Sequence, residues 1–157
     1  MSPIDRFRAI VRPPTWLGPG LIGSELSSLE HFGWGGWQFG FGDHCTLRTD
    51  SLWRIVKPTG IVVTSEDHGQ RFGLPHPVDV CEAVADAVPM SLCITAVSIG
   101  SATADLRLNF GPSVSLDVIN TSSGHEAWQL SLRLETEMLE LVAMGGGGLL
   151  VPEKQRE

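Results

Sequence analysis

The sequence predicts an α+β fold that is mostly β: a duplicated antiparallel meander of two four- or five-stranded halves with one connecting helix. Three observations lead to this prediction. Apolar and polar residues alternate over many short runs, which is the pattern of half-buried strands. Only one stretch, residues 78–88, has apolar residues at a clear helical spacing. The two halves also share a Phe-Gly turn and a later Trp-containing strand at matching places.

The N-terminal segment is expected to be extended and loosely docked. Four prolines fall within the first twenty residues, and each proline removes a backbone donor and restricts φ. Trp16 and Leu17 are the apolar residues that could attach this segment to the rest of the protein.

The first half, residues 21–65, contains a series of predicted strands. Between Trp37 and Phe41, aromatic residues occupy every second position, so one face of that strand is aromatic. The run Ile61-Val62-Val63-Thr64 is β-branched, which suits a pleated surface. Gly42-Asp43 and Thr59-Gly60 predict turns between neighbouring strands.

A loop over residues 66–77 and a helix over residues 78–88 connect the halves. The loop contains two glycines and two prolines, which oppose regular structure. In the helix, valine and alanine residues form an apolar stripe opposite acidic residues. Pro77 suits its first turn, and Pro89 ends it.

The second half, residues 90–145, repeats the order of the first. Phe41-Gly42 matches Phe110-Gly111, and Trp53 matches Trp128 after six extra residues. Two such meanders could pack face to face, or they could continue as one curved sheet covered by the helix.

Length and composition predict one domain spanning residues 1–157. The chain is 42% hydrophobic and 18% charged, which excludes a wholly disordered protein. It has no apolar run of the ~18 residues that a membrane span needs. The first residues do not form a charged segment followed by an apolar one, and three cysteines are an odd number. We therefore expect a cytoplasmic protein with free thiols.

The net charge of −7 lies entirely in the second half, because residues 76–157 contain eleven acidic and four basic side chains. This balance disfavours binding to nucleic acid or to an anionic membrane. The acidic excess could form an interaction face, or it could serve only to keep the surface soluble.

No catalytic residue, metal site or cofactor is predicted. The His, Cys and acidic residues at 43–45, 66–68 and 76 lack the spacing of known metal motifs. Cys45, Cys81 and Cys93 are predicted to be structural; Cys45 matches Val114 of the second half. The run Gly145 to Gly148 lacks the Lys-Ser or Lys-Thr of a phosphate loop and predicts a bend.

Residues predicted to bind a partner fall in three places. The polar inter-repeat loop, which could also be a plain connector, contributes Glu66, Asp67, His68 and Arg71. The expansion ahead of Trp128, where the repeats diverge, contributes His125 and Glu126.

The third place is the final hairpin, with Glu135, Glu137 and Glu140. Glu135 and Glu137 share a face if their strand is regular. Together with Asp105 and Asp117, they could form a negative surface that speeds association with a basic partner. Most of the five tryptophans should be core residues, and an exposed one could anchor an interface.

The second half resembles a family of small bacterial proteins of unknown function that share a DLxLxF, ExW and GGG pattern. The matching segments are Asp105 to Phe110, Glu126-Ala127-Trp128 and Gly145 to Gly148, and His125 stands where the family more often has tyrosine. Small acidic proteins of this kind resemble the immunity proteins that neutralise polymorphic toxins. That resemblance implies a protein partner and no enzymatic activity.

The expected function is therefore a non-enzymatic protein-binding module. It could be an immunity protein that occludes the active site of a cognate toxin, either a nuclease or an NAD-degrading enzyme. One alternative is a small-ligand-binding protein or enzyme that uses Asp67, His68 and His76. Another is a structural protein that oligomerises through its sheet edges.

Overall fold

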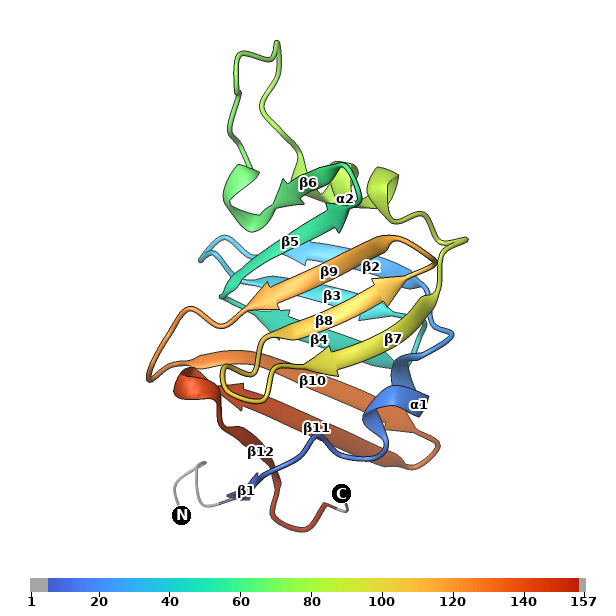
Figure 1. Ribbon diagram of the computed structural model, residues 1–157, viewed down its shortest axis with the longest axis vertical. Coiled ribbons are helices and arrows are strands. Elements are labelled where there is room, and N and C mark those ends of the chain that lie inside the picture. The colour runs from blue at the N-terminus through green and yellow to red at the C-terminus, as the bar shows by residue number, and fades with distance from the viewer. Residues whose placement is uncertain (1–5, 156–157) are drawn as a thin grey trace.

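Two antiparallel sheets lie face to face in the computed structural model, which describes residues 6–155 (Figure 1). The larger sheet has the strand order β1-β12-β11-β10-β4-β3-β2, and the smaller has the order β6-β5-β9-β8-β7. Trp53 of the smaller sheet makes edge-to-face ring contacts with Trp37 and Phe39 of the larger one. The mostly β, α+β class is confirmed, and the two sheets pack face to face. The predicted meanders of four or five strands are wrong in one respect, because only three consecutive strands of each half lie side by side in one sheet.

Each half of the chain contributes five of the described strands. The first half forms β2 (Leu26–His31), β3 (Trp37–Phe41), β4 (Cys45–Thr49), β5 (Leu52–Lys57) and β6 (Gly60–Thr64). The second half forms β7 (Ile94–Ile99), β8 (Leu106–Phe110), β9 (Val114–Ile119), β10 (Glu126–Leu134) and β11 (Glu137–Met144). Outside the halves, β1 (Phe7–Ile10) pairs with β12 (Leu149–Pro152).

The halves follow the same pairing scheme and exchange their last two strands. The β2-β3-β4 meander is extended by β10 and β11 of the second half, and the β7-β8-β9 meander by β5 and β6 of the first. The registers agree, since Trp53 lies opposite Val118 on β9 and Trp128 lies opposite Thr49 on β4. This exchange places both tryptophans, which are at most 1% exposed, in the core between the sheets.

The shared Phe-Gly turns have the same backbone conformation. Gly42 has φ 55° and Gly111 has φ 54°, a left-handed geometry that glycine adopts without a steric penalty. Their N–H groups donate to the carbonyls of Glu25 (2.9 Å) and Cys93 (3.0 Å). Glu25 and Cys93 also bridge each other, as equivalent residues do across a two-fold relation. The duplication is therefore visible in the backbone pairing as well as in the sequence.

The connecting helix is α2 (Val80–Ala87), within the predicted range. Asp79 caps it by accepting a hydrogen bond from the N–H of Glu82 at 3.2 Å. The helix buries Val80, Val84 and Ala87, and it contacts β6 and β2. It therefore covers one end of the sandwich, where the two sheets would otherwise be open (Figure 1).

The N-terminal segment is more ordered over its described residues than the prolines suggested. It pairs with β12 through β1 and then forms the short helix α1 (Leu17–Leu21). The prolines are compatible with this structure because Pro13 and Pro14 follow β1 and Pro14 supplies a carbonyl to the N–H of Leu17 at 3.2 Å. Trp16 and Leu17 are buried, as expected.

The glycine run after β11 forms a tight bend, η3 (Gly145–Gly147), against neighbouring loops. A Cβ atom at Gly145 would collide with the backbone of Gly124, and one at Gly147 would collide with the carbonyl of Ala102. The predicted bend is therefore confirmed. A second short turn, η2 (Ser65–Asp67), follows β6. None of the helices among the described residues has the length and apolarity that a membrane crossing requires.

Candidate functional site

The residues predicted to bind a partner lie in three separate parts of the molecule. Residues 66–77 lead into a loop that projects beyond β6 and α2, whereas the β10–β11 turn lies at one side of the molecule, in the half away from that loop (Figure 1). Glu126, which follows His125, begins β10 and so lies at the other end of that strand from the turn. One continuous surface containing all nine predicted residues is therefore not formed.

The acidic surface expected around the final hairpin is smaller than predicted. Glu135 has φ 49° and lies in the turn between β10 and β11, so it does not share a strand face with Glu137. Asp117 is only 5% exposed, and its carboxylate accepts hydrogen bonds from Arg107 (2.8 Å) and Arg54 (3.4 Å). Its charge is therefore used within the protein rather than presented to a partner.

The projecting loop, residues 70–77, is called the finger below. Its base is closed by two backbone hydrogen bonds, from Gly69 N–H to the Val78 carbonyl (2.9 Å) and from Val78 N–H to the Gln70 carbonyl (2.7 Å). Closer to the tip, the Arg71 guanidinium donates to the Pro75 carbonyl at 2.9 Å. These contacts order the finger without help from the rest of the protein.

The tip of the finger presents apolar side chains to solvent. Phe72 is 68% exposed and Leu74 is 53% exposed. Phe72 also has φ 46°, a left-handed conformation that costs a bulky residue about 1 kcal/mol or more. A strained aromatic residue at an exposed tip contributes little to folding, so its position points to an intermolecular contact.

Asp67 and His68 have structural partners at the base of the finger. The Asp67 carboxylate accepts from the N–H of Thr64 at 2.8 Å, and His68 Nδ1 accepts from the N–H of Val80 at 3.4 Å. The His68 ring also meets His31 and Trp37 edge-on. Across residues 6–155, no three His, Cys, Asp or Glu side chains gather in a way that could hold a metal ion.

The cysteines are placed as structural residues. Cys45 is 3% exposed, and burial raises the pKa of its thiol from 9.0 to about 12. Burial, and then the charge of Asp79, also raise the pKa of Cys81. A thiol with a raised pKa holds little thiolate at neutral pH, so neither group is suited to act as a nucleophile.

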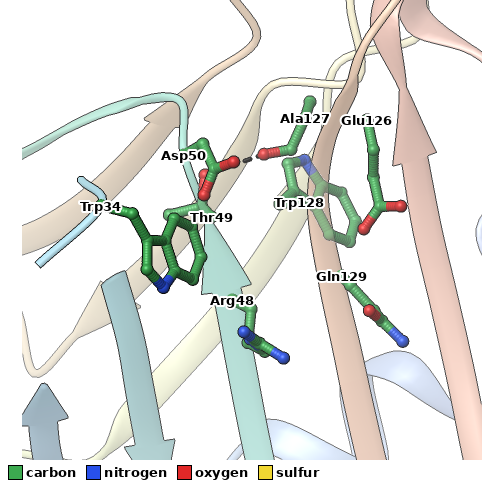
Figure 2. Close-up of a pocket in the computed structure, with 8 residues that line it drawn as sticks. All are labelled: Trp34, Arg48, Thr49, Asp50, Glu126, Ala127, Trp128 and Gln129. Atoms are coloured by element: carbon green, nitrogen blue, oxygen red, sulfur yellow. Dashed lines mark hydrogen bonds between the residues drawn. The ribbon is translucent and has the colours of Figure 1, made fainter. Parts of the chain in front are cut away.

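A pocket of about 310 Å³ lies on the outer face of the larger sheet, where β4 ends and β10 begins (Figure 2). Trp34 from the β2–β3 connection, Arg48 of β4 and Glu126 of β10 surround it, and Asp50 and Gln129 complete its polar lining. Both Thr49 (2.8 Å) and Ser51 (3.2 Å) donate a hydroxyl hydrogen bond to the Ala127 carbonyl. These bonds hold Asp50 near Glu126.

Trp34 is the exposed tryptophan, with 64% of its surface accessible. Its ring stacks on Phe32 at 5.4 Å between centroids, and the Arg48 guanidinium also lies over the Phe32 ring, 5.4 Å from its centroid. A Cβ atom at Gly36 would collide with the Trp34 ring and come within 2.9 Å of Asp50 Oδ1. Gly36 therefore allows the indole and the Asp50 carboxylate to lie side by side.

Glu126 carries a negative charge that its surroundings only partly compensate. Partial burial of its carboxyl group, and then the charge of Asp50, raise its pKa, while Arg48 lowers it to a smaller extent. Two carboxylates that repel each other across a pocket favour a positively charged occupant.

The sequence identified Glu126 in this pocket but missed Trp34, Arg48 and Asp50. One feature of the sequence could have indicated Trp34. In Gly33-Trp34-Gly35-Gly36 a large aromatic residue lies among glycines in a turn, where few side chains can bury it. Comparison of the chain with protein-family models, curated proteins and solved structures gives no match.

Proposed function

We propose that the protein is a non-enzymatic protein-binding module of the immunity type, which occludes the active site of a cognate toxin. The observation that carries the proposal is the finger, an ordered projection with exposed Phe72 and Leu74 at its tip. Apolar groups on a preformed loop bind a concave surface with a small entropic cost, because the loop is already ordered.

The charges of the finger suggest what kind of cleft it would enter. Arg71 is the charged residue between positions 70 and 77, and the finger has no carboxylate. A cleft lined by apolar and acidic side chains would therefore complement it. Catalytic carboxylates of a nuclease or of an NAD-degrading enzyme are groups of this kind. The acidic remainder of the chain would steer a basic toxin surface toward the complex.

The test is relief of growth inhibition in a bacterial host. The proposal predicts that a toxin domain is encoded beside this gene. That domain is expressed alone, with the wild-type chain, and with a chain carrying Phe72→Ser and Leu74→Ser. We expect the wild-type chain to restore growth and the finger variant to fail. Both changed residues are exposed, so the variant should unfold at the same denaturant concentration as the wild type, which circular dichroism checks.

Met138→Ser is the matched control, because Met138 is 57% exposed near the start of β11, on a strand of the larger sheet away from the finger. This variant should restore growth fully. If the finger variant also restores growth, or if the wild-type chain does not protect the host, the proposal is wrong. Light scattering of the purified chain at several concentrations tests the alternative of self-assembly, which predicts a mass that rises with concentration.

A further inference from the structure

We propose that the pocket formed by Trp34, Asp50 and Glu126 receives an arginine side chain of the protein partner. The inference rests on the proposed function for the source of that side chain. The chemistry of the pocket can nevertheless be tested without any partner, because a free guanidinium compound should bind to it.

The shape and lining of the pocket fit a guanidinium group. The exposed indole of Trp34 is fixed by its stack on Phe32 and by its contact with Gly36, so it offers a preformed flat wall. A cation over an indole face is attracted by the ring quadrupole, and the planar guanidinium stacks well on it. The Asp50 carboxylate beside this wall can accept hydrogen bonds from the same group.

The Glu126 carboxylate and the neutral Gln129 amide complete the group of side chains that would bind the guanidinium. Glu126 lies across the pocket from Trp34, and Gln129 lies between Glu126 and Arg48 (Figure 2). Arg48 leaves the lining with a net negative charge, since two carboxylates face one guanidinium, and that guanidinium is held over Phe32. An incoming cation would therefore relieve the repulsion between Asp50 and Glu126.

The other half of the protein provides an internal comparison. In the equivalent place on the smaller sheet, β9 carries Asp117 where β4 carries Arg48, and Asp117 is already bonded to two arginines. The repeat position of Asp50 holds Ile119, and the expansion that supplies Glu126 is absent from the first half. Arg48, Asp50 and Glu126, which line the pocket, thus have no counterparts of the same kind in the other half.

The experiment is an NMR titration of the full chain with Nα-acetyl-arginine amide. The neutral isostere, Nα-acetyl-citrulline amide, serves as the matched probe. We expect a saturable shift of the Trp34 indole N–H and the Gln129 amide with the arginine compound. The citrulline compound should bind about tenfold more weakly, because it loses the charge-assisted hydrogen bonds.

Variants distinguish binding in the pocket from a general effect of the protein's net charge. Asp50→Asn with Glu126→Gln should abolish the shift, whereas Glu135→Gln with Glu137→Gln, which removes the same charge at the far turn, should leave it unchanged. Gly36→Ala should weaken binding by displacing Trp34. Equal binding of both probes, no saturable shift, or equal loss in the two charge variants would overturn the inference. None of these results depends on the finger, so the proposed function stands or falls separately in the growth assay.

Discussion

The outer faces of the two sheets occupy equivalent positions in the duplicated fold but carry different arrangements of charge. On the smaller sheet, Arg54 and Arg107 flank Asp117 across three strands, and each arginine is bonded to the Asp117 carboxylate. On the larger sheet, Gln129 and Gln38 flank Arg48 in the same registers. The first arrangement is an ion-pair network within the protein, whereas the second places one cation, Arg48, between two neutral amides.

This contrast separates the positions that the two halves share from those in which they differ. The core positions of both halves kept their apolar character, since packing between the sheets constrains them. Loops at the strand ends are free of that constraint and diverged. The Trp34 turn and the expansion before Trp128 are segments in which one half differs from the other, and the finger lies in the connection between the halves.

The largest difference between the faces should appear when the central residue of each is changed. Asp117→Asn leaves two arginines without their carboxylate. It should lower the free energy of unfolding by about 2–3 kcal/mol, a low value for the loss of one partner of a buried ion pair, because this ion pair is only partly buried. Arg48→Gln should change it by less than about 0.5 kcal/mol, as expected for an exposed side chain. Urea unfolding at neutral pH measures both. Equal effects would show that the two faces do not differ in the way described.

A second difference concerns Cys45 and its counterpart Val114. The folded-state pKa of Cys45, about 12, lies above its ordinary value of 9.0. The protonated Cys45 thiol therefore makes its full contribution to the free energy of unfolding below pH 9. That contribution is lost as pH rises toward 12, because the unfolded chain releases the proton first. By pH 10.5 the free energy of unfolding should have fallen by about 2 kcal/mol, at 1.36 kcal/mol per pH unit.

Cys45→Val should remove this alkaline loss and should cost little at pH 7, because the equivalent position already holds valine. Val114→Cys should introduce a second loss of similar size. The chain has no tyrosine, so no phenol contributes between pH 9 and 12; Cys81 adds to the loss equally in all three chains. Denaturant unfolding at a series of pH values checks the prediction, and an unchanged slope in Cys45→Val would contradict it.

The smallest difference concerns Trp53 and Trp128, the two core tryptophans at matching positions of the halves. Trp128 Nε1 donates to the Ala104 carbonyl at 2.9 Å, whereas Trp53 Nε1 is buried with no hydrogen-bond partner among residues 6–155. Trp128→Phe should therefore destabilise the protein by about 1 kcal/mol more than Trp53→Phe, since it leaves a buried carbonyl without a donor. Thermal unfolding of both variants measures this gap. A greater loss in Trp53→Phe would mean that its indole N–H has a partner in solution.

Much of the fold could be predicted because it depends on the periodicity of apolar residues and on similar sequence segments in the two halves. Alternation gave the strands, the valine and alanine stripe gave α2, and the two Phe-Gly pairs gave the equivalent turns. The exchange of the last hairpins could not be predicted, because alternation specifies which face of β5 or β10 is buried but not which strand lies beside it.

The candidate site was less accessible to sequence reasoning. Glu126 and Arg71 stood out as charged residues in loops, but Trp34 meets Asp50 only because β2, β3 and β4 fold back on one another. Asp117 shows the reverse case: its partners, Arg54 and Arg107, come from two other strands, and only their pairing shows that its charge is already neutralised. Such long-range contacts are not visible in local spacing.

Amide hydrogen exchange tests the central claim most directly, namely that binding uses the connection between the halves and the segments in which they differ. The chain is compared free and in complex with the toxin domain used in the growth assay, which is the partner proposed above. We predict slower exchange in the complex over residues 70–77 and around Trp34 and Glu126, with no change on the Arg54, Asp117 and Arg107 face. Protection confined to that face, or to the β10–β11 turn, would contradict the account.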